Sequence, residues 1–306
     1  MLRYLKTAFL VIATGALLWF AWQSRNLLLE VIRNARPLYL VSAALLWTLL
    51  NAIAAVFTSR VFGQLGADVS IAKAANIHVR NLPARYLPGG IWHTVGRVAD
   101  YRQLGVGGRE ISGFVFLENA LAACTAFLLG GVLLWLTRVA NTGGQVAIAA
   151  AAAAIVILAL LPAILSRFVG TDKTNISLAT ILRLLPLAIL SWSVAAAAFV
   201  IYVSAFPGLQ TAPALLEIAG AYLFSWGVGF VAIFAPQGIG VFEVVAAELL
   251  RGAAPLMGVT ALFAGFRLII MLSDAMAWTG MQLWSGFAVG QRGDLLGNQA
   301  DQEDDH

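Results

Sequence analysis

The stretch RNLPARYLPGGIWHTVGRVADYR, residues 80–102, is the feature around which the rest of the chain is organised. It is polar and broken by proline in a chain that is otherwise 60% hydrophobic. At its centre Pro88, Gly89 and Gly90 are followed by Ile91 and Trp92. Proline removes a backbone donor and disfavours helix at the preceding residue, and glycine permits turns closed to other residues. The stretch therefore predicts a break between helical segments.

A second copy of this pattern begins at Pro236, which lies 148 positions after Pro88. It continues as Gln237, Gly238, Ile239 and Gly240. The offset is close to half of the 306 residues, so the pattern predicts an internal repeat with halves at about 1–150 and 151–290. Paired Gly/Pro interruptions in two halves indicate a transporter-like binding site. The alternative is that both breaks are tight interfacial turns between ordinary spans.

Charged residues follow the two breaks in reciprocal order. Arg97 and then Glu118 follow the first break, whereas Glu243 and then Arg267 follow the second. From this order we expect Glu118 to pair with Arg267, and Glu243 with Arg97, in one polar network at a shared cavity. The alternative is that the pairs only hold two halves together.

The composition indicates a polytopic α-helical membrane protein, because several apolar runs reach the ~20 residues that a helix needs to cross a bilayer. Only 11% of residues are charged. The net charge of +4 comes from basic residues between the apolar runs, a pattern that sets membrane orientation and does not favour nucleic-acid binding. Cys124 is the single cysteine, the three histidines have no metal-ligand spacing, and no soluble-enzyme motif is present, so we expect no cofactor, no metal and no enzymatic activity.

The fold expected is an all-α membrane bundle of seven or eight crossings, in one transmembrane domain over residues 1–290, with an acidic, disordered tail at 291–306. A segment at Ile239–Leu250 is too short to cross and predicts a re-entrant or interfacial half-helix. An amphipathic surface helix is expected at Ile71–Arg80. The predicted spans are Thr7–Trp22, Leu38–Phe62, Ile111–Thr137, Gln145–Leu165, Leu178–Phe206, Ala212–Ala235 and Met257–Val289.

Basic residues also predict the orientation. The region 60–109 carries seven Lys/Arg against Asp68 and Asp100, and with seven crossings it lies on the same side as the amino terminus. Since cytoplasmic loops are enriched in Lys and Arg, we expect the amino terminus to lie in the cytoplasm. The expected location of the protein is the cytoplasmic membrane.

Ionisable residues at membrane depth indicate functional positions, because each costs about 2.5–3.5 kcal/mol on insertion scales. Glu118, Glu243, Arg267 and Asp274 lie in predicted spans or in the half-helix. Arg267 and Asp274 are seven residues apart, so they share a helix face about 10 Å apart along its axis. We therefore expect each to have a partner on another element.

Arginines around the first break predict a receptor for an anionic head group. Arg80, Arg85, Arg97 and Arg102 lie within 23 residues, and guanidinium groups bind phosphate bidentately. A helix restarting after Gly90 would add free N–H groups and its positive end. The alternative is ordinary positive charge of a cytoplasmic loop.

The two Pro/Gly motifs and the charged residues that follow them resemble the lysylphosphatidylglycerol synthase transmembrane region family. This family comprises flippase-like bacterial and archaeal membrane proteins. The resemblance spans about Leu38–Val289. The string Pro236-x-Gly238-x-Gly240-x-x-Glu243, followed by an arginine within a span, is its most specific piece. The other matching positions are Leu87, Pro88, Gly89, Gly90, Trp92, Arg97, Glu118 and Arg267.

The resemblance implies a protein that moves a lipid between leaflets. Well-known members also carry a soluble aminoacyltransferase domain, but fewer than 20 residues follow the last predicted span here, so we do not expect synthase activity. We expect binding and translocation of an anionic lipid, either a phospholipid or a polyprenyl-phosphate-linked intermediate. One alternative is a non-transporting scaffold for a lipid-pathway enzyme. A weaker one is an integral-membrane transferase, for which no catalytic carboxylate–base set can be named.

Overall fold

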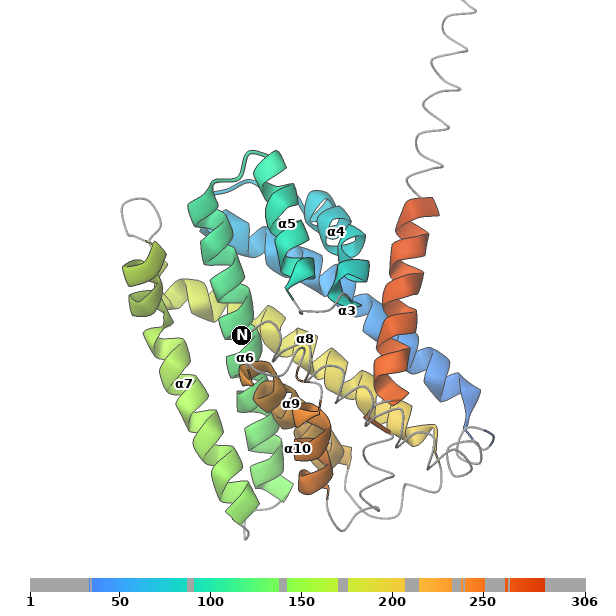
Figure 1. Cartoon of the computed structure of the whole chain (residues 1–306). Coiled ribbons are helices and arrows are strands. Elements are labelled where there is room, and N and C mark those ends of the chain that lie inside the picture. The colour runs from blue at the N-terminus through green and yellow to red at the C-terminus, as the bar shows by residue number, and fades with distance from the viewer. Residues whose placement is uncertain are drawn as a thin grey trace, which may run out of the picture.

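The chain folds as an all-α membrane bundle (Figure 1). The computed structural model describes residues 33, 35–86, 91–137, 142–169, 176–206, 215–232, 238, 240–250, 262–263 and 265–283. Within these ranges the regular structure is helical and there is no strand. The first predicted span, Thr7–Trp22, and the acidic tail at 291–306 lie outside the described residues.

Long helices form the body of the bundle, and four of them are long and apolar enough to cross a membrane. A helix of 28 residues, such as α3, extends about 42 Å at 1.5 Å per residue, which exceeds a hydrocarbon core of about 30 Å. The four correspond to predicted spans, each longer or shorter by a few residues. They are α3 (Pro37–Gln64), α6 (Gly108–Thr137), α7 (Thr142–Val169) and α8 (Leu178–Ser204).

The carboxyl-terminal part of the described chain contains shorter apolar helices. The predicted span Ala212–Ala235 is represented by α9 (Leu215–Val231), and the predicted half-helix is α10 (Val241–Leu249). With nine residues α10 is about 14 Å long, too short to cross a bilayer. Residues 265–283 are helical and belong to the last predicted span.

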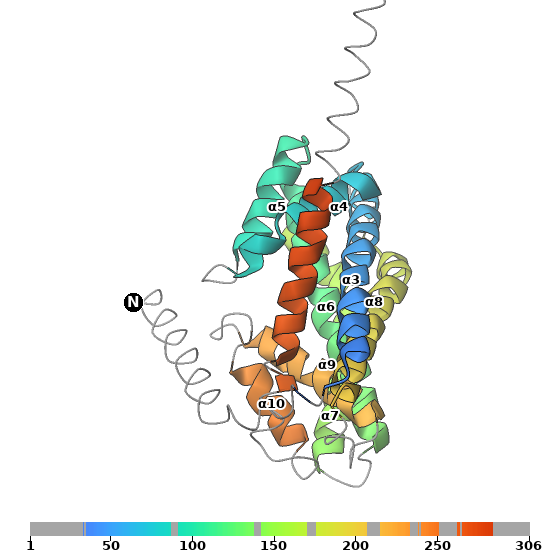
Figure 2. The same ribbon diagram turned by 90° about the vertical axis from the view of Figure 1, so that its right-hand side faces the viewer.

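The polar stretch around the first break folds into short helices at one end of the bundle. They are α4 (Ile71–Arg80), the 3₁₀ helix η1 (Leu82–Tyr86) and α5 (Trp92–Gln103). The predicted helix at Ile71–Arg80 is confirmed, and its N-cap Ser70 hydroxyl accepts the backbone N–H of Lys73 at 3.3 Å. Figures 1 and 2 show α4 and α5 beside each other at that end, with α10 nearer the other. The helix at 265–283 crosses α3 and reaches the short helices (Figures 1 and 2).

Two apolar cores lie at the two ends of the long helices. One core lies beside the short helices and includes Phe62, Tyr101, Phe114 and Leu117. The other is rich in aromatic rings, and there Phe199 stacks on Tyr222 at 4.6 Å between ring centroids. Helices α3, α6, α7 and α8 contribute to both cores, so the two ends are joined by continuous helices.

Glycines allow α6 to approach both of its neighbours closely. A Cβ atom on Gly130 would lie 2.5 Å from the backbone nitrogen of Phe224 in α9. A Cβ on Gly131 would lie 2.3 Å from the carbonyl oxygen of Ala147 in α7. Small residues at such contacts are typical of membrane helices, where association depends on close packing rather than on exclusion of water.

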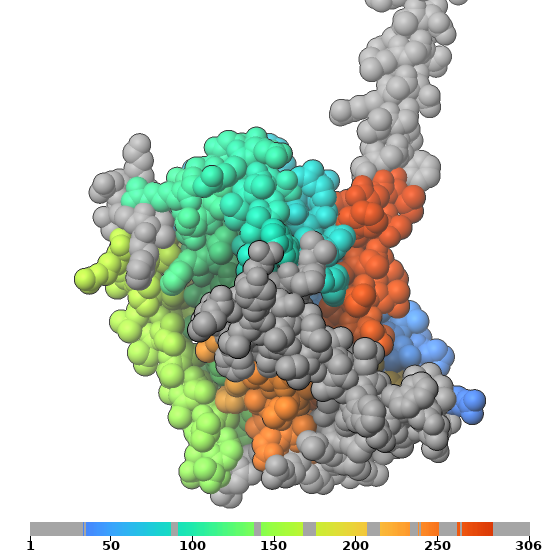
Figure 3. All heavy atoms as spheres, viewed as in Figure 1, coloured from blue at the N-terminus to red at the C-terminus, as the bar shows by residue number. Residues whose placement is uncertain are grey.

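Apolar side chains also cover outer surfaces of the bundle. On α7, Val146, Ile155, Val156 and Leu160 are all exposed. Figure 3 shows α7 along one flank of the molecule, where its outer side meets no other helix. Exposed apolar residues on this scale are expected of a surface that faces lipid, because hydrocarbon chains solvate them.

We predict that Gly131→Ala lowers the free energy of unfolding by about 1–3 kcal/mol, since the added methyl group meets backbone that cannot move away without separating α6 from α7. Gly280→Ala is the matched control, because no atom of the described chain lies within 4 Å of the position its Cβ would take. Thermal unfolding of the two variants in detergent measures the difference. Equal unfolding temperatures would contradict this account of the α6–α7 contact.

Candidate functional site

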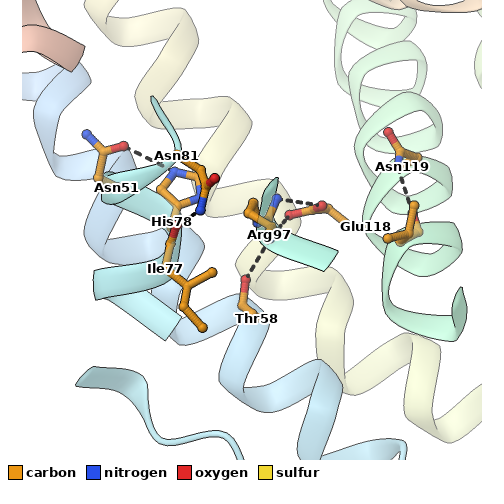
Figure 4. A network of polar contacts seen from close by, with 9 residues as sticks. Asn51, Thr58, Ile77, His78, Asn81, Arg97, Glu118 and Asn119 are labelled. Carbon is orange, nitrogen blue, oxygen red and sulfur yellow. Dashed lines mark hydrogen bonds and ion pairs between the residues drawn. The ribbon is translucent and has the colours of Figure 1, made fainter. Parts of the chain in front are cut away.

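Arg97 of α5 forms a bidentate ion pair with Glu118 of α6 (Figure 4). Its two terminal nitrogens donate to the two carboxylate oxygens, each at 3.0 Å. One of them also lies 3.5 Å from the hydroxyl oxygen of Thr58 in α3. The pair therefore connects the short helix after the first break to two long helices.

The aromatic ring of Phe114 lies beside the Arg97 guanidinium. The guanidinium lies 4.8 Å from the centre of this ring, a distance that permits a cation–π interaction. Burial alone would lower the pKa of Arg97, but the Glu118 carboxylate outweighs this effect and raises it. Arg97 thus stays charged in an apolar setting because Glu118 neutralises it.

Glu243 and Arg267 form the equivalent contact after the second break. Arg267 donates its Nε–H to Glu243 Oε1 at 2.7 Å, and the backbone N–H of Gly240 donates to Oε2, also at 2.7 Å. Gly240 has φ of +85°, which side chains disfavour, so glycine is required where α10 begins. Gly238, at φ +67°, packs so closely on Gly229 of α9 that a Cβ would lie 2.9 Å from its backbone. The carboxylate caps α10 and holds the arginine.

The reciprocal pairing expected from the sequence is wrong. Glu118 pairs with Arg97 and not with Arg267, and Glu243 pairs with Arg267 and not with Arg97. Arg97 and Glu118 are 21 residues apart, and Glu243 and Arg267 are 24 residues apart, so each pair forms between elements that are close along the chain. The four residues therefore form two local pairs, and the buried partner is a cation in one pair and an anion in the other.

A third ion pair joins the first break to the last helix. Arg85 of η1 donates to Asp274 Oδ2 at 3.0 Å, and the Tyr86 hydroxyl donates to the same oxygen at 2.8 Å. Burial, reinforced by the Asp274 carboxylate, raises the pKa of Tyr86, so the hydroxyl keeps its proton and remains a donor. The other oxygen of Asp274 is buried and has no hydrogen-bond partner among the described residues. The expected partner of Asp274 on another element is therefore Arg85.

Each of these three pairs combines a buried side chain with a partly exposed one. The exposed fractions are 4% for Arg97 against 25% for Glu118, 3% for Glu243 against 30% for Arg267, and 2% for Asp274 against 32% for Arg85. A buried ion that lost its partner would be left unpaired in a medium of low dielectric constant. The buried member consequently fixes the position of its exposed partner.

Two histidine rings lie beside the Arg97 pair. His78 of α4 and His93 of α5 meet edge to face at 5.3 Å between centroids. His78 Nε2 lies 3.2 Å from the amide oxygen of Asn51, which can only accept, so Nε2 carries the proton (Figure 4). Burial, with the nearby positive charges of Arg97 and Arg85, lowers the pKa of both histidines, so both rings are neutral.

Arg80 and Trp92 lie at the periphery of the site. Arg80 is more than half exposed and forms an ion pair with Asp100, which also accepts the side-chain N–H of Asn81 at 2.7 Å. Surface pairs of this kind contribute little to stability. Trp92 is exposed at the start of α5, as expected of a residue at a membrane interface. Pro88, Gly89, Gly90 and Pro236 lie outside the described residues, and so does the proximity expected for the two breaks.

The sequence reasoning did not identify several residues of the site. Tyr86 is one of them, and its hydroxyl donates to Asp274. Asn51 and Thr58 are polar residues within the apolar run of α3, and that interruption is the signal that could have marked them. No family model matches the chain, and no curated protein does.

We predict that Arg97 and Glu118 are energetically coupled to each other, and that Glu118 is not coupled to Arg267. Arg97→Gln and Glu118→Gln should each destabilise the protein by about 3–5 kcal/mol, because each leaves a buried or partly buried charge unpaired. The double variant should lose much less than the sum of the two single losses. Thermal unfolding in detergent measures all three.

Glu118→Gln combined with Arg267→Gln is the control for this cycle. These residues belong to different pairs, so their losses should add to within about 0.5 kcal/mol. Strong coupling between Glu118 and Arg267, with none between Glu118 and Arg97, would contradict this prediction and support the pairing of Glu118 with Arg267.

We also predict that stability falls as the pH drops below about 6.5, the pKa of an unperturbed histidine. Because the folded-state pKa of His78 is lowered, the unfolded chain binds more protons below that pH, and acid favours unfolding. The loss should approach about 1.4 kcal/mol per pH unit for one fully neutral buried histidine. Unfolding temperatures between pH 7.5 and 5.5 should show this slope, and His78→Gln should reduce it. An unchanged slope in that variant would assign the effect to other groups.

Proposed function

We propose that the protein binds an anionic membrane lipid, a phospholipid or a polyprenyl-phosphate-linked intermediate, and helps its head group cross the bilayer. The proposal starts from a membrane bundle whose apolar helices carry charges that insertion alone would disfavour. It assigns no catalytic step, and the residues that it uses are those of the ion pairs described above.

The observation that carries the proposal is a pair of partly exposed arginines along one helix. Arg267 belongs to the helix at 265–283, and Arg85 is bound to that helix through Asp274. Positions 267 and 274 are about two helical turns apart, or about 10 Å along the axis, on one face. Both guanidinium groups rest on buried carboxylates. A head group could therefore move between two oriented cations along this face.

Arg267 has the geometry of a phosphate ligand. Its Nε–H is used by Glu243, whereas its terminal nitrogens make no hydrogen bond to any residue that the structure describes. Guanidinium presents its N–H donors in a planar fork that matches two phosphate oxygens. The guanidinium also lies 5.4 Å from the Phe242 ring centre, which helps to fix its plane. We assign Arg267 as an anchor for the head group, with its orientation set by Glu243.

Arg97 has a different role in this proposal. Both of its terminal nitrogens are directed at Glu118 and its side chain is buried, so a head group could not reach it without breaking that pair. Arg97 holds α5 against α3 and α6, and this in turn supports the neighbouring segment that carries Arg85. It is a positioning residue.

We predict that Arg267→Gln slows transfer of anionic lipid about 10- to 100-fold, the range for losing about 1.5–3 kcal/mol of charged hydrogen bonding. Arg267→Lys should give an intermediate rate because it keeps the charge and loses the planar fork. The measurement is dithionite quenching of fluorescent phosphatidylglycerol in reconstituted vesicles, with fluorescent phosphatidylcholine as the zwitterionic comparison.

Arg183→Gln is the matched control, since Arg183 is an exposed arginine on α8 outside the site, and its transfer rate should stay within about twofold of the unaltered protein. The proposal would be overturned if the protein transferred phosphatidylglycerol no faster than protein-free vesicles do, and if a polyprenyl phosphate gave the same result. If a lipid-modifying enzyme then co-purified with the chain, the scaffold function would replace it.

A further inference from the structure

We infer that Asp274 takes up a proton when an anionic head group binds Arg85, so that lipid and proton occupy the protein together. The inference rests on the proposed function and extends it by naming the coupled ion. Its basis is the contact between the buried carboxylate of Asp274 and the partly exposed side chain of Arg85.

Asp274 is the most buried acidic group of the three pairs, and only one of its oxygens is engaged. Oδ2 accepts from Arg85 and from Tyr86. Oδ1 is buried without a hydrogen-bond partner in the described part of the chain. Native buried polar atoms are nearly always hydrogen-bonded, so an open carboxylate oxygen at this depth calls for an explanation. A position that alternates between carboxylate and carboxylic acid provides one.

The groups around Asp274 leave Arg85 as its only cationic partner among the described residues. From η1, Arg85 and Tyr86 face it. Where α3 meets this helix, the neighbouring Ser273 hydroxyl donates to the carbonyl oxygen of Ala44, and α3 brings no charged group into the contact. His78 of α4 and His93 of α5 lie near Arg85 and are neutral. The charge of Asp274 therefore depends on a single arginine.

That arginine can be shared with a phosphate only if the carboxylate gives up its charge. A phosphate drawing Arg85 away would leave Asp274 as an unpaired buried anion, which is strongly disfavoured. A proton from solvent binding to a carboxylate oxygen removes this charge. The O–H bond formed replaces the ion pair, and Arg85 now balances the phosphate. One negative charge and one positive charge enter together, so the step is electroneutral.

The contact reaches the surface of the described structure through its partners. The side chain of Arg85 and the ring of Tyr86 are both partly exposed, although Asp274 itself is buried. The Tyr86 hydroxyl holds its proton and touches Oδ2, so it links the buried carboxylate to the surface. Head group and proton can thus arrive from the same side of the contact.

Isothermal calorimetry tests the inference directly. Dioctanoyl-phosphatidylglycerol is titrated into the detergent-purified full chain in two buffers of different ionisation enthalpy, which gives the protons taken up per lipid bound. We expect the unaltered protein to take up about one proton per lipid bound, because lipid binding and proton binding at Asp274 are coupled. Asp274→Asn, which cannot ionise, should bind the lipid with no proton uptake. The exposed Asp68→Asn is the control and should still take up about one.

Transport supplies a second readout. In reconstituted vesicles a pH gradient should change the rate of phosphatidylglycerol transfer, whereas a potassium diffusion potential should not, because the coupled step moves no net charge. Lipid binding by the unaltered protein without proton uptake would overturn the inference and leave the proposed function intact. Absence of lipid binding would overturn both. If Asp274→Asn fails to fold, the measurement on the unaltered protein still decides.

Discussion

The structure depends on the requirement that every buried charge in a low-dielectric bundle has a partner held in place. Among the described residues the buried charges are Arg97, Glu243 and Asp274, and each is matched by one partly exposed group of opposite sign. None of these contacts lies within a single helix. Each one therefore fixes how a short helix packs against a long helix.

The three contacts differ in what they join. The Arg97 and Glu243 pairs are local, each connecting a short helix to a longer helix that follows it in the chain. The Asp274 contact is the long-range one, connecting residues 189 positions apart. In the Arg97 pair one arginine binds both oxygens of one carboxylate, whereas at Asp274 an arginine and a tyrosine share one oxygen. The bidentate Arg97 pair is suited to holding structure, whereas the contact at Asp274 leaves one buried carboxylate oxygen without a hydrogen-bond partner among the described residues.

Apolar packing provides the rigid frame in which these contacts can be so specific. Gly130 and Gly131 bring α6 against α9 and α7, where a methyl group would meet backbone atoms. The stacked rings around Phe199 fill the opposite core. A core packed this densely does not deform continuously, so a change at one polar contact moves whole helices.

The sequence alone determined the helical class, the position of most described helices and the residues that would be charged at depth, because apolar runs of membrane length and isolated ionisable residues are local signals. It did not determine which charges would meet. The reciprocal order of Arg97, Glu118, Glu243 and Arg267 is compatible with either pairing, and only the packing of adjacent elements selects one. The contact between η1 and Asp274 has no local signal at all. It exists because the helix at 265–283 crosses α3 and reaches η1, and neither the spacing nor the composition of the sequence predicts such a tertiary arrangement.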